Sequence, residues 1–318
     1  MKVAWVFPGQ GAQSVGMGAE IFSASDAARD VLARADAALG EPLSRLIAEG
    51  PEETLTLTAN TQPAIVTVSC AILAALREKV PSLETPAFAA GHSLGEYSAL
   101  VAAGALTLED AVRIVRMRGR AMQDAVPPGQ GAMSAVMGLD PEQVERVCKR
   151  AAEETSAVVS PANFNAPGQV VIAGDAVAVA RAGELVSAEK GKAIALKVSA
   201  PFHCSLMAPA ARIVAAELER VAIGPLAFPV VANVDAHPNT DASRVKDLLV
   251  RQVDSPVRWE ASVKLMASAG VTHILEIGPG KVLAGLIRRI SKGSPNELKV
   301  LSINDAGSLA EAAAFLDA

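Results

Sequence analysis

Residues 86–96 read PAFAAGHSLGE, an apolar stretch that turns through Gly91, Ser93 and Gly95 into a helical run over 96–103. This order predicts a strand, a tight turn and a helix. In such a turn the glycines relieve crowding, the Ser93 hydroxyl projects into a pocket, and the helix directs its positive N-terminus at developing negative charge. Short Gly and Ser patterns also occur by chance in a chain rich in Gly and Ala. Evidence from other residues is therefore needed to identify Ser93 as a nucleophile.

The composition predicts an α/β protein. The chain has 318 residues, enough for one large domain with a smaller insert. Hydrophobic residues make up 51% of the chain but aromatic residues only 3%, so the core must consist of small aliphatic side chains packed closely around strands and helices. The net charge is −5 and no long basic run occurs, which argues against nucleic acid as a partner.

Cysteine usage and hydropathy predict a soluble cytoplasmic protein without metal or membrane. The three cysteines, an odd number without metal-ligand spacing, are Cys70, Cys148 and Cys204. The apolar N-terminal stretch stops at Pro8, too early for a signal peptide. The longest uncharged segment, 54–76, is interrupted by polar residues and Pro63, and the apolar remainder from residue 64 is shorter than a membrane span.

The hydrophobic pattern predicts a mostly parallel sheet with helices on both faces. A strand over 2–7 is apolar throughout, which is typical of a strand buried on both faces, and it breaks at Pro8 and Gly9. Further segments are expected as helices over 25–38, 63–79, 107–125 and 205–221, strands over 228–232 and 271–277, a helix from 281, and a last strand and helix.

A compact insert interrupts this core. Residues 127–131 read PPGQG, the clearest linker in the chain, and a β-α-β-β-α-β series follows over 132–137, 141–154, 157–161, 169–173, 176–189 and 192–197. That order is typical of a ferredoxin-like arrangement. We therefore expect a small subdomain over 127–198, inserted in a catalytic domain formed by 1–126 and 199–318.

A serine nucleophile needs a base, and the chain has only four histidines. His92 adjoins Ser93, where neighbouring side chains diverge, so it is expected to line or support the turn. His237 lies in a polar turn sequence, and His273 lies in an apolar strand pattern typical of a core histidine. His203 follows the insert where a helix begins, and sites form at such domain junctions. It could also be a simple helix cap, but together with Ser93 it is the best candidate base.

The tetrahedral oxyanion of acyl transfer also needs donors. The backbone N–H of Leu94 is one candidate, and the loop over 8–13, PGQGAQ, is the expected source of the second. This loop is not a dinucleotide site, because Ser14 replaces the third glycine. Residues 278–281, GPGK, lack the spacing of a phosphate loop, and Val282 replaces its Ser or Thr. No nucleotide, metal or other cofactor is expected.

Four arginines, at positions 113, 116, 118 and 120, crowd one helix, mostly as a solvated face. Helical spacing does not let all of them point outward, and Arg118 is the one expected to turn toward the sheet. A buried guanidinium needs an anion, and its planar fork suits a carboxylate. Spacing leaves open whether that carboxylate belongs to a substrate or to an internal Asp or Glu.

These segments together resemble the malonyl-CoA:acyl carrier protein transacylase family of type II fatty acid synthesis, over essentially the whole chain. The resembling motifs are FPGQGAQ (7–13), GHSLGEY (91–97), RMRGR (116–120), NAPGQVV (165–171), PFHCSLM (201–207), NVDA (233–236), QVDSPVRW (252–259) and EIGPGK (276–281). The resemblance implies an α/β hydrolase-like core with a ferredoxin-like subdomain and an active site between them.

The resemblance also implies the site residues. Ser93 would be the nucleophile and His203 the base, with the main-chain carbonyl of Gln252 in place of a triad acid. Gln10 and the Leu94 amide would hold the oxyanion. The residues implied at the substrate are Arg118, which would bind the malonyl carboxylate, and His92, Asn165 and Phe202. A Phe before the base accompanies malonyl rather than methylmalonyl units in related domains.

The implied reaction moves malonyl from malonyl-CoA to the phosphopantetheine thiol of acyl carrier protein through a malonyl-serine ester, with ping-pong kinetics. We expect a monomer. A related malonyl transferase that serves a polyketide synthase or a malonate decarboxylase carrier stays open, because only the carrier differs. A serine esterase is the other alternative, which the insert and Arg118 argue against. A silent carrier-binding module would be expected to lack Ser93 or His203.

Overall fold

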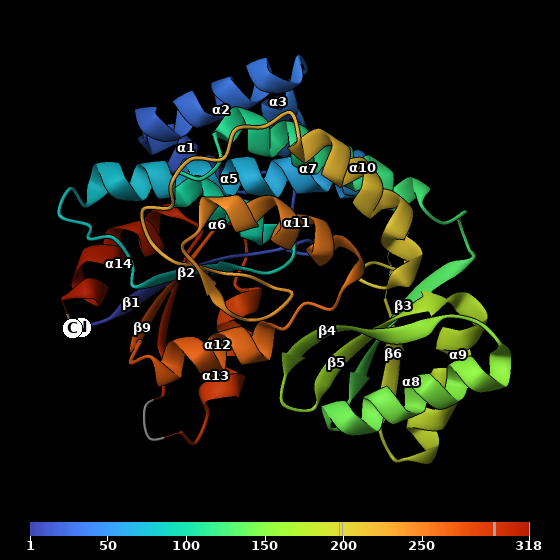
Figure 1. The fold of residues 1–318 in the computed structure, drawn as a ribbon. Helices are drawn as coiled ribbons and strands as arrows, with labels where there is room; N and C mark the ends of the chain where they lie inside the picture. Colours follow the sequence, from blue (N-terminus) through green and yellow to red (C-terminus); the bar gives the residue numbers. More distant parts are fainter. Residues whose placement is uncertain (197, 199, 295–296, 318) are drawn as a thin grey trace.

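The computed structural model describes residues 1–318 except 197, 199, 295–296 and 318. Its larger sheet has six strands in the order β10-β9-β1-β2-β7-β8, all parallel except β8 (Figure 1). The strands are β1 (Val3–Phe7), β2 (Phe88–Gly91), β7 (Val230–Val231), β8 (Pro238–Asn239), β9 (His273–Ile277) and β10 (Lys299–Ile303). The expected mostly parallel α/β core is confirmed.

Helices cover both faces of this sheet. The central strand β1 is therefore buried on both faces, which explains why its residues are apolar throughout. Trp5 and Phe7 enter the core formed with α2 (Asp26–Leu39), α5 (Thr58–Lys79) and α7 (Leu108–Asp124). Ala4 and Val6 point to the other face and pack with α12 (Trp259–Ser268) and α13 (Val282–Ser291). Figure 1 shows these two helical layers on opposite sides of the sheet. Alternate residues of one strand thus serve two cores.

The remaining elements of this part are shorter or lie at its edges. They are α1 (Ala19–Ala24), α3 (Leu43–Glu49), α4 (Glu52–Thr56), α6 (Gly95–Ala102), η1 (Ser205–Met207), α10 (Ala208–Leu218), η2 (Ala242–Arg244), α11 (Val245–Asp254) and α14 (Ala306–Leu316). The helix expected over 205–221 is therefore divided, with η1 before α10. The strand expected over 228–232 shortens to the two residues of β7.

Helix α5 begins earlier than the sequence predicted. It starts at Thr58 and contains Pro63 in its second turn, where the missing N–H removes one helical hydrogen bond. The helix is therefore long enough and apolar enough to cross a membrane. It is the only such helix among the described residues. However, 83% of its apolar window is buried inside the structure. Burial, rather than insufficient length, identifies α5 as a core helix.

The smaller sheet is antiparallel, in the order β4-β5-β3-β6, the strand order of the ferredoxin-like fold (Figure 1). Its elements are β3 (Gly131–Met137), α8 (Pro141–Thr155), β4 (Val159–Ala166), β5 (Gln169–Asp175), α9 (Ala176–Ala188) and β6 (Lys192–Ala195). They enclose a separate apolar core. The end of the strand expected over 192–197 and the proposed boundary at residue 199 fall partly outside the described residues, so the domain boundaries stay a prediction.

Strand β4 links the smaller sheet to the segment before α12. It was expected over 157–161 but continues to Ala166, and its second half runs beside the segment before α12. The Phe164 N–H donates to the Val257 carbonyl at 2.9 Å, and the Val257 N–H donates to the Ala162 carbonyl at 2.9 Å. The longer strand brings the smaller sheet against the loops that follow the parallel strands, which is where α/β proteins form their sites.

Candidate active site

Ser93 sits on a strained turn between β2 and α6. Its φ is 52°, in the left-handed region that non-glycine residues seldom occupy. The flanking glycines are required by contact: a Cβ on Gly91 would lie 1.8 Å from the Gly95 carbonyl carbon, and one on Gly95 would lie 2.2 Å from the Phe7 carbonyl oxygen. The backbone of the elbow therefore packs directly on itself and on the end of β1, with Ser93 half-buried at the turn.

Asn233, two residues after β7, fastens this turn from the neighbouring strand. Its side-chain Oδ1 accepts from the Ser93 N–H at 2.7 Å, and its Nδ2 donates to the Gly91 carbonyl at 2.6 Å. The Ser93 amide is thereby occupied and is not directed at a substrate. Asn233 was identified beforehand only as part of the motif NVDA (233–236), because its contact with the elbow depends on the pairing of β7 with β2.

Ser93, His203 and Gln252 form a hydrogen-bonded series. The Ser93 Oγ lies 2.7 Å from His203 Nε2, and His203 Nδ1 lies 2.9 Å from the main-chain carbonyl of Gln252. Because a carbonyl only accepts, Nδ1 carries the proton and Nε2 is free to accept the serine hydroxyl. Burial, and then the charge of Arg118, lowers the pKa of His203 to about 3, which keeps the imidazole neutral. His203 also has a positive φ of 60°.

Arg118 is turned inward, as its spacing predicted, and is 1% exposed. Its Nη1 donates to Gln62 Oε1 at 2.8 Å, and its Nη2 donates to Gln252 Oε1 at 2.9 Å and to Ser93 Oγ at 3.2 Å. Among the described residues no Asp or Glu forms an ion pair with it. Burial lowers the pKa of Arg118, since the charged form has lost its water. A buried guanidinium held by neutral groups beside Ser93 could bind an anion there, and the expected role of Arg118 stays a prediction.

Gln62 was missed by sequence reasoning. It appeared only as an interruption of the apolar segment that becomes α5. In the structure it is 2% exposed and faces Arg118 from the second turn of that helix. Gln62 and Asn60 are the two amides of this largely apolar helix, and a buried amide needs a polar partner, but the sequence alone does not show which of the two is buried.

The loop after β1 packs on the elbow. A Cβ on Gly9 would lie 2.5 Å from the His92 carbonyl oxygen, so this glycine permits the close approach. Gln10, which follows it, donates from Nε2 to Thr58 Oγ1 at 3.4 Å. Leu94 lies directly after Ser93, at the N-cap position of α6. Both expected oxyanion donors thus lie on segments that meet at the elbow, and their roles stay predictions.

The three other expected substrate residues lie near Ser93 in different ways. His92 Nε2 and Asn165 Oδ1 are 2.8 Å apart, so a residue of the elbow is bonded to a residue of β4. The His92 ring also contacts Trp259 edge to face at 5.7 Å. Phe202 is 8% exposed and packs in the large core just before His203. The two sheets therefore both contribute to the surroundings of Ser93.

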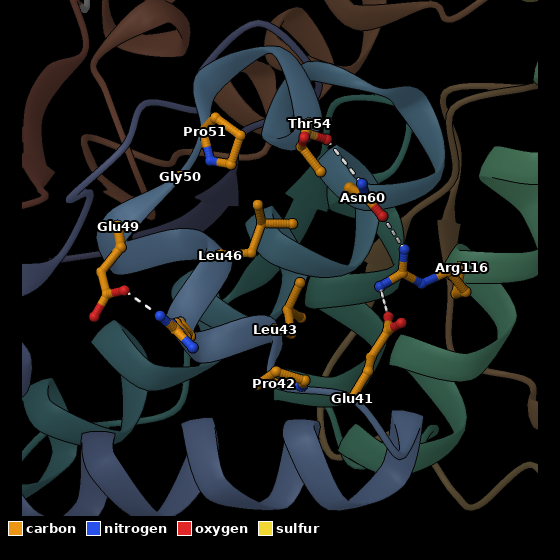
Figure 2. Close-up of a pocket in the computed structure, with 11 residues that line it drawn as sticks. Glu41, Pro42, Leu43, Leu46, Glu49, Gly50, Pro51, Thr54, Asn60 and Arg116 are labelled. Carbon is orange, nitrogen blue, oxygen red and sulfur yellow. Dashed lines mark hydrogen bonds and ion pairs between the residues drawn. The ribbon is translucent and has the colours of Figure 1, made fainter.

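A cavity of about 520 Å³ reaches His203 between the smaller sheet and the segment before α12. It is lined among others by Pro161, Phe164, His203, Ser205, Pro256 and Arg258. A separate cavity of about 560 Å³ lies beside α3 and α4 and contains none of the residues at Ser93 (Figure 2). Within the described part of the chain, no group of three or more His, Cys, Asp or Glu side chains could hold a metal ion.

Arg116, which lines this second cavity, is buried and not solvated as expected. Arg116 was expected on the solvated face of its helix, but it is 8% exposed and pairs with Glu41 and Asn60. Both partners come from segments distant in sequence, which is why helical spacing alone did not predict the burial.

The chain is similar to known proteins over almost its whole length. The profile of the acyl transferase domain family matches residues 4–307. The malonyl CoA-acyl carrier protein transacylase of Salmonella typhimurium is 48% identical over 312 residues, 98% of each chain. The crystal structure of an acyl carrier protein S-malonyltransferase from Vibrio cholerae is 45% identical with a TM-score of 0.94, covering 98% of this chain and 100% of that one.

A further solved relative is a malonyl-transacylase in complex with the acyl-carrier protein of a type II polyketide synthase. It is 46% identical with a TM-score of 0.93, covering 98% of this chain and 99% of that one. The chain belongs to the acyl transferase family and, within it, to the malonyl-CoA:acyl carrier protein transacylases.

Proposed function

We propose that this enzyme transfers the malonyl group from malonyl-CoA to the phosphopantetheine thiol of an acyl carrier protein, through a malonyl ester of Ser93. One observation carries the proposal: Ser93 Oγ lies 2.7 Å from a neutral histidine nitrogen and 3.2 Å from a buried guanidinium. The first neighbour activates the hydroxyl. The second provides the charge that a free carboxylate on the acyl group would need.

In the first half-reaction His203 acts as the base. Its Nε2 takes the Ser93 proton as Oγ attacks the thioester carbonyl, and the Gln252 carbonyl steadies the imidazolium that forms. The negative charge on the carbonyl oxygen is held by the Leu94 amide and Gln10 in this proposal. The C–S bond then breaks, and CoA leaves as a thiol with the proton that His203 returns. The acyl group is now an ester on Ser93.

The second half-reaction runs in reverse with a new thiol. The phosphopantetheine thiol of the carrier gives its proton to His203 and attacks the ester carbonyl. The C–O bond breaks, Ser93 regains the proton, and malonyl leaves as a thioester of the carrier. Because CoA departs before the carrier thiol reacts, the kinetics are ping-pong.

Arg118 selects the acyl group in this scheme. The malonyl carboxylate carbon is two bonds beyond the ester carbon, and Arg118 Nη2 already contacts the oxygen that forms the ester. A guanidinium binds a carboxylate through two parallel hydrogen bonds, whereas an acetyl group offers no such partner. His92, Asn165 and Phe202 are proposed to line the same acyl site.

The setting of the reaction is also part of the proposal. All three cysteines are free and buried in the structure, which fits the reducing cytoplasm. The carrier of fatty acid synthesis is the proposed acceptor, and a polyketide carrier is the second candidate because one solved relative is bound to such a carrier.

The test follows the malonyl group to its acceptor. The enzyme is mixed with malonyl-CoA and phosphopantetheinylated carrier proteins from fatty acid and polyketide systems, with Ser93→Ala as the control. Malonyl-carrier is expected by mass spectrometry. The relative rates of malonyl transfer to the two carriers identify the carrier, and thus the pathway, that the enzyme serves. Free malonate as the main product, with no malonyl-carrier, would instead identify a hydrolase.

A further inference from the structure

A buried carboxyl group lies beneath the nucleophile and is not used by the mechanism above. Glu96 lies on α6, three residues after Ser93, and is 2% exposed. Its Oε2 accepts from the Asn233 N–H at 3.0 Å and from Gln252 Nε2 at 2.8 Å. A buried carboxyl is costly unless its acceptors are satisfied, so this placement calls for a reason.

Gln252 connects Glu96 to the reacting groups. Its Nε2 donates to the Ser93 carbonyl at 2.9 Å as well as to Glu96, and its Oε1 accepts from Arg118 Nη2 at 2.9 Å. Both amide hydrogens are therefore occupied by acceptors. A flipped amide would place Oε1 against two oxygens and the NH₂ group against the guanidinium. The two acceptors thus fix which end of the amide faces Arg118.

We infer that Glu96 is a positioning residue that acts through Gln252 to hold the Arg118 guanidinium at Ser93, and so sets the preference for acyl groups with a free carboxylate. The inference rests on the proposed function of Arg118. Glu96 touches neither the acyl group nor the reacting atoms. Its contribution is the orientation of one amide, which in turn aims one guanidinium nitrogen.

An acceptor oxygen, rather than a full charge, is what this role requires. Burial raises the pKa of Glu96 to about 7, against the lowering effects of Gln252, Asn233 and Arg118, while the charge of Asp235 adds to the rise. A protonated carboxyl still offers one acceptor oxygen, and so does a glutamine amide. Glu96→Gln is therefore expected to keep the orientation of Gln252, and Glu96→Ala to lose it.

The experiment compares kcat/KM for malonyl-CoA and acetyl-CoA with the same carrier protein. Glu96→Ala should lower the malonyl-to-acetyl ratio about tenfold, the cost of one lost buried hydrogen bond, and Glu96→Gln should restore most of it. If Glu96→Ala does not fold, Glu96→Asp replaces it, because the shorter side chain withdraws the acceptor from Gln252. Glu276→Ala is the matched control: this carboxyl is also buried but bonds to the start of α13, so its loss should lower stability and leave the ratio unchanged.

A double-mutant cycle separates positioning from mere stability. In an Arg118→Ala background, Glu96→Ala should change the ratio by less than about twofold, because the group it positions is gone. Equal losses for both acyl groups, or a full tenfold effect in that background, would overturn the inference. Failure of the wild-type enzyme to prefer malonyl would instead contradict the proposed function.

Discussion

Replacing Arg118 by alanine should change which acyl group the enzyme accepts. The substitution removes a guanidinium that is 1% exposed and that donates to two glutamine oxygens and to Ser93. The malonyl carboxylate would then enter a buried site without a positive partner. Acetyl carries no charge and loses nothing comparable, so the two substrates should respond differently.

The burial of Arg118 sets the magnitude. Breaking a buried ion pair by removing one partner costs about 3–5 kcal/mol, because the remaining charge is left uncompensated. At about 1.4 kcal/mol for each factor of ten in rate, the loss for malonyl transfer is roughly 150- to 5,000-fold. Solvent screening does not reduce this range much, since water is excluded from the guanidinium.

The assay measures kcat/KM for malonyl-CoA and acetyl-CoA with the wild-type enzyme and Arg118→Ala. Arg120→Ala serves as the control, because this arginine lies on the same helix but is exposed. The malonyl-to-acetyl ratio should fall by at least about a hundredfold in Arg118→Ala and stay constant in the control. Equal losses for both substrates would refute the reasoning and make Arg118 a structural residue.

Three further predictions concern the elbow, the base and the buried carboxyl. Gly91→Ala should destabilise the fold by more than about 4 kcal/mol, because the new Cβ would lie 1.8 Å from the Gly95 backbone, which has no room to move. A denaturation midpoint like that of the wild type would contradict this prediction. Burial lowers the pKa of His203 to about 3, so the rate of acyl loading, measured by stopped flow, should show no acid limb near pH 6.5. A loading rate that falls tenfold per pH unit below pH 6.5 would contradict this prediction. Burial raises the pKa of Glu96 from 4.5 to about 7. Between pH 4.5 and about 7 the folded state therefore retains a proton that the unfolded state releases, so the free energy of unfolding falls as the pH rises through this range. Urea unfolding should therefore show the wild type losing up to about 3 kcal/mol relative to Glu96→Gln over that window, whereas a constant difference would show that Glu96 has an ordinary pKa.

The sequence predicted the features that local patterns determine. The elbow was predictable because an apolar strand, two glycines and a helix are contiguous around Ser93. The inward turn of Arg118 followed from helical spacing, and the β-α-β-β-α-β order of the insert predicted its strand order. The assignments that came from the resemblance alone, such as the Gln252 carbonyl, have no local signal.

Residues that act across the fold were not predictable in this way. Gln62, Asn233 and Glu96 meet near Ser93 from α5, the loop after β7 and α6, and only the packing of these elements reveals their contacts. The extension of β4 to Ala166 was missed because its pairing with β5 is irregular at two points, and because Asn163 also bridges to Val257, about ninety residues later. Long-range pairing of this kind leaves little mark on a single stretch of sequence.

The central claim is that the malonyl group passes through an ester on Ser93. The direct measurement is an intact-mass spectrum, followed by peptide mapping, after brief mixing with malonyl-CoA or acetyl-CoA in the absence of a carrier. We expect a malonyl adduct on the peptide that contains Ser93, discharged when carrier protein is added and absent with acetyl-CoA or in Ser93→Ala. A malonyl adduct that persists in Ser93→Ala, or transfer without any adduct in the wild type, would contradict the account.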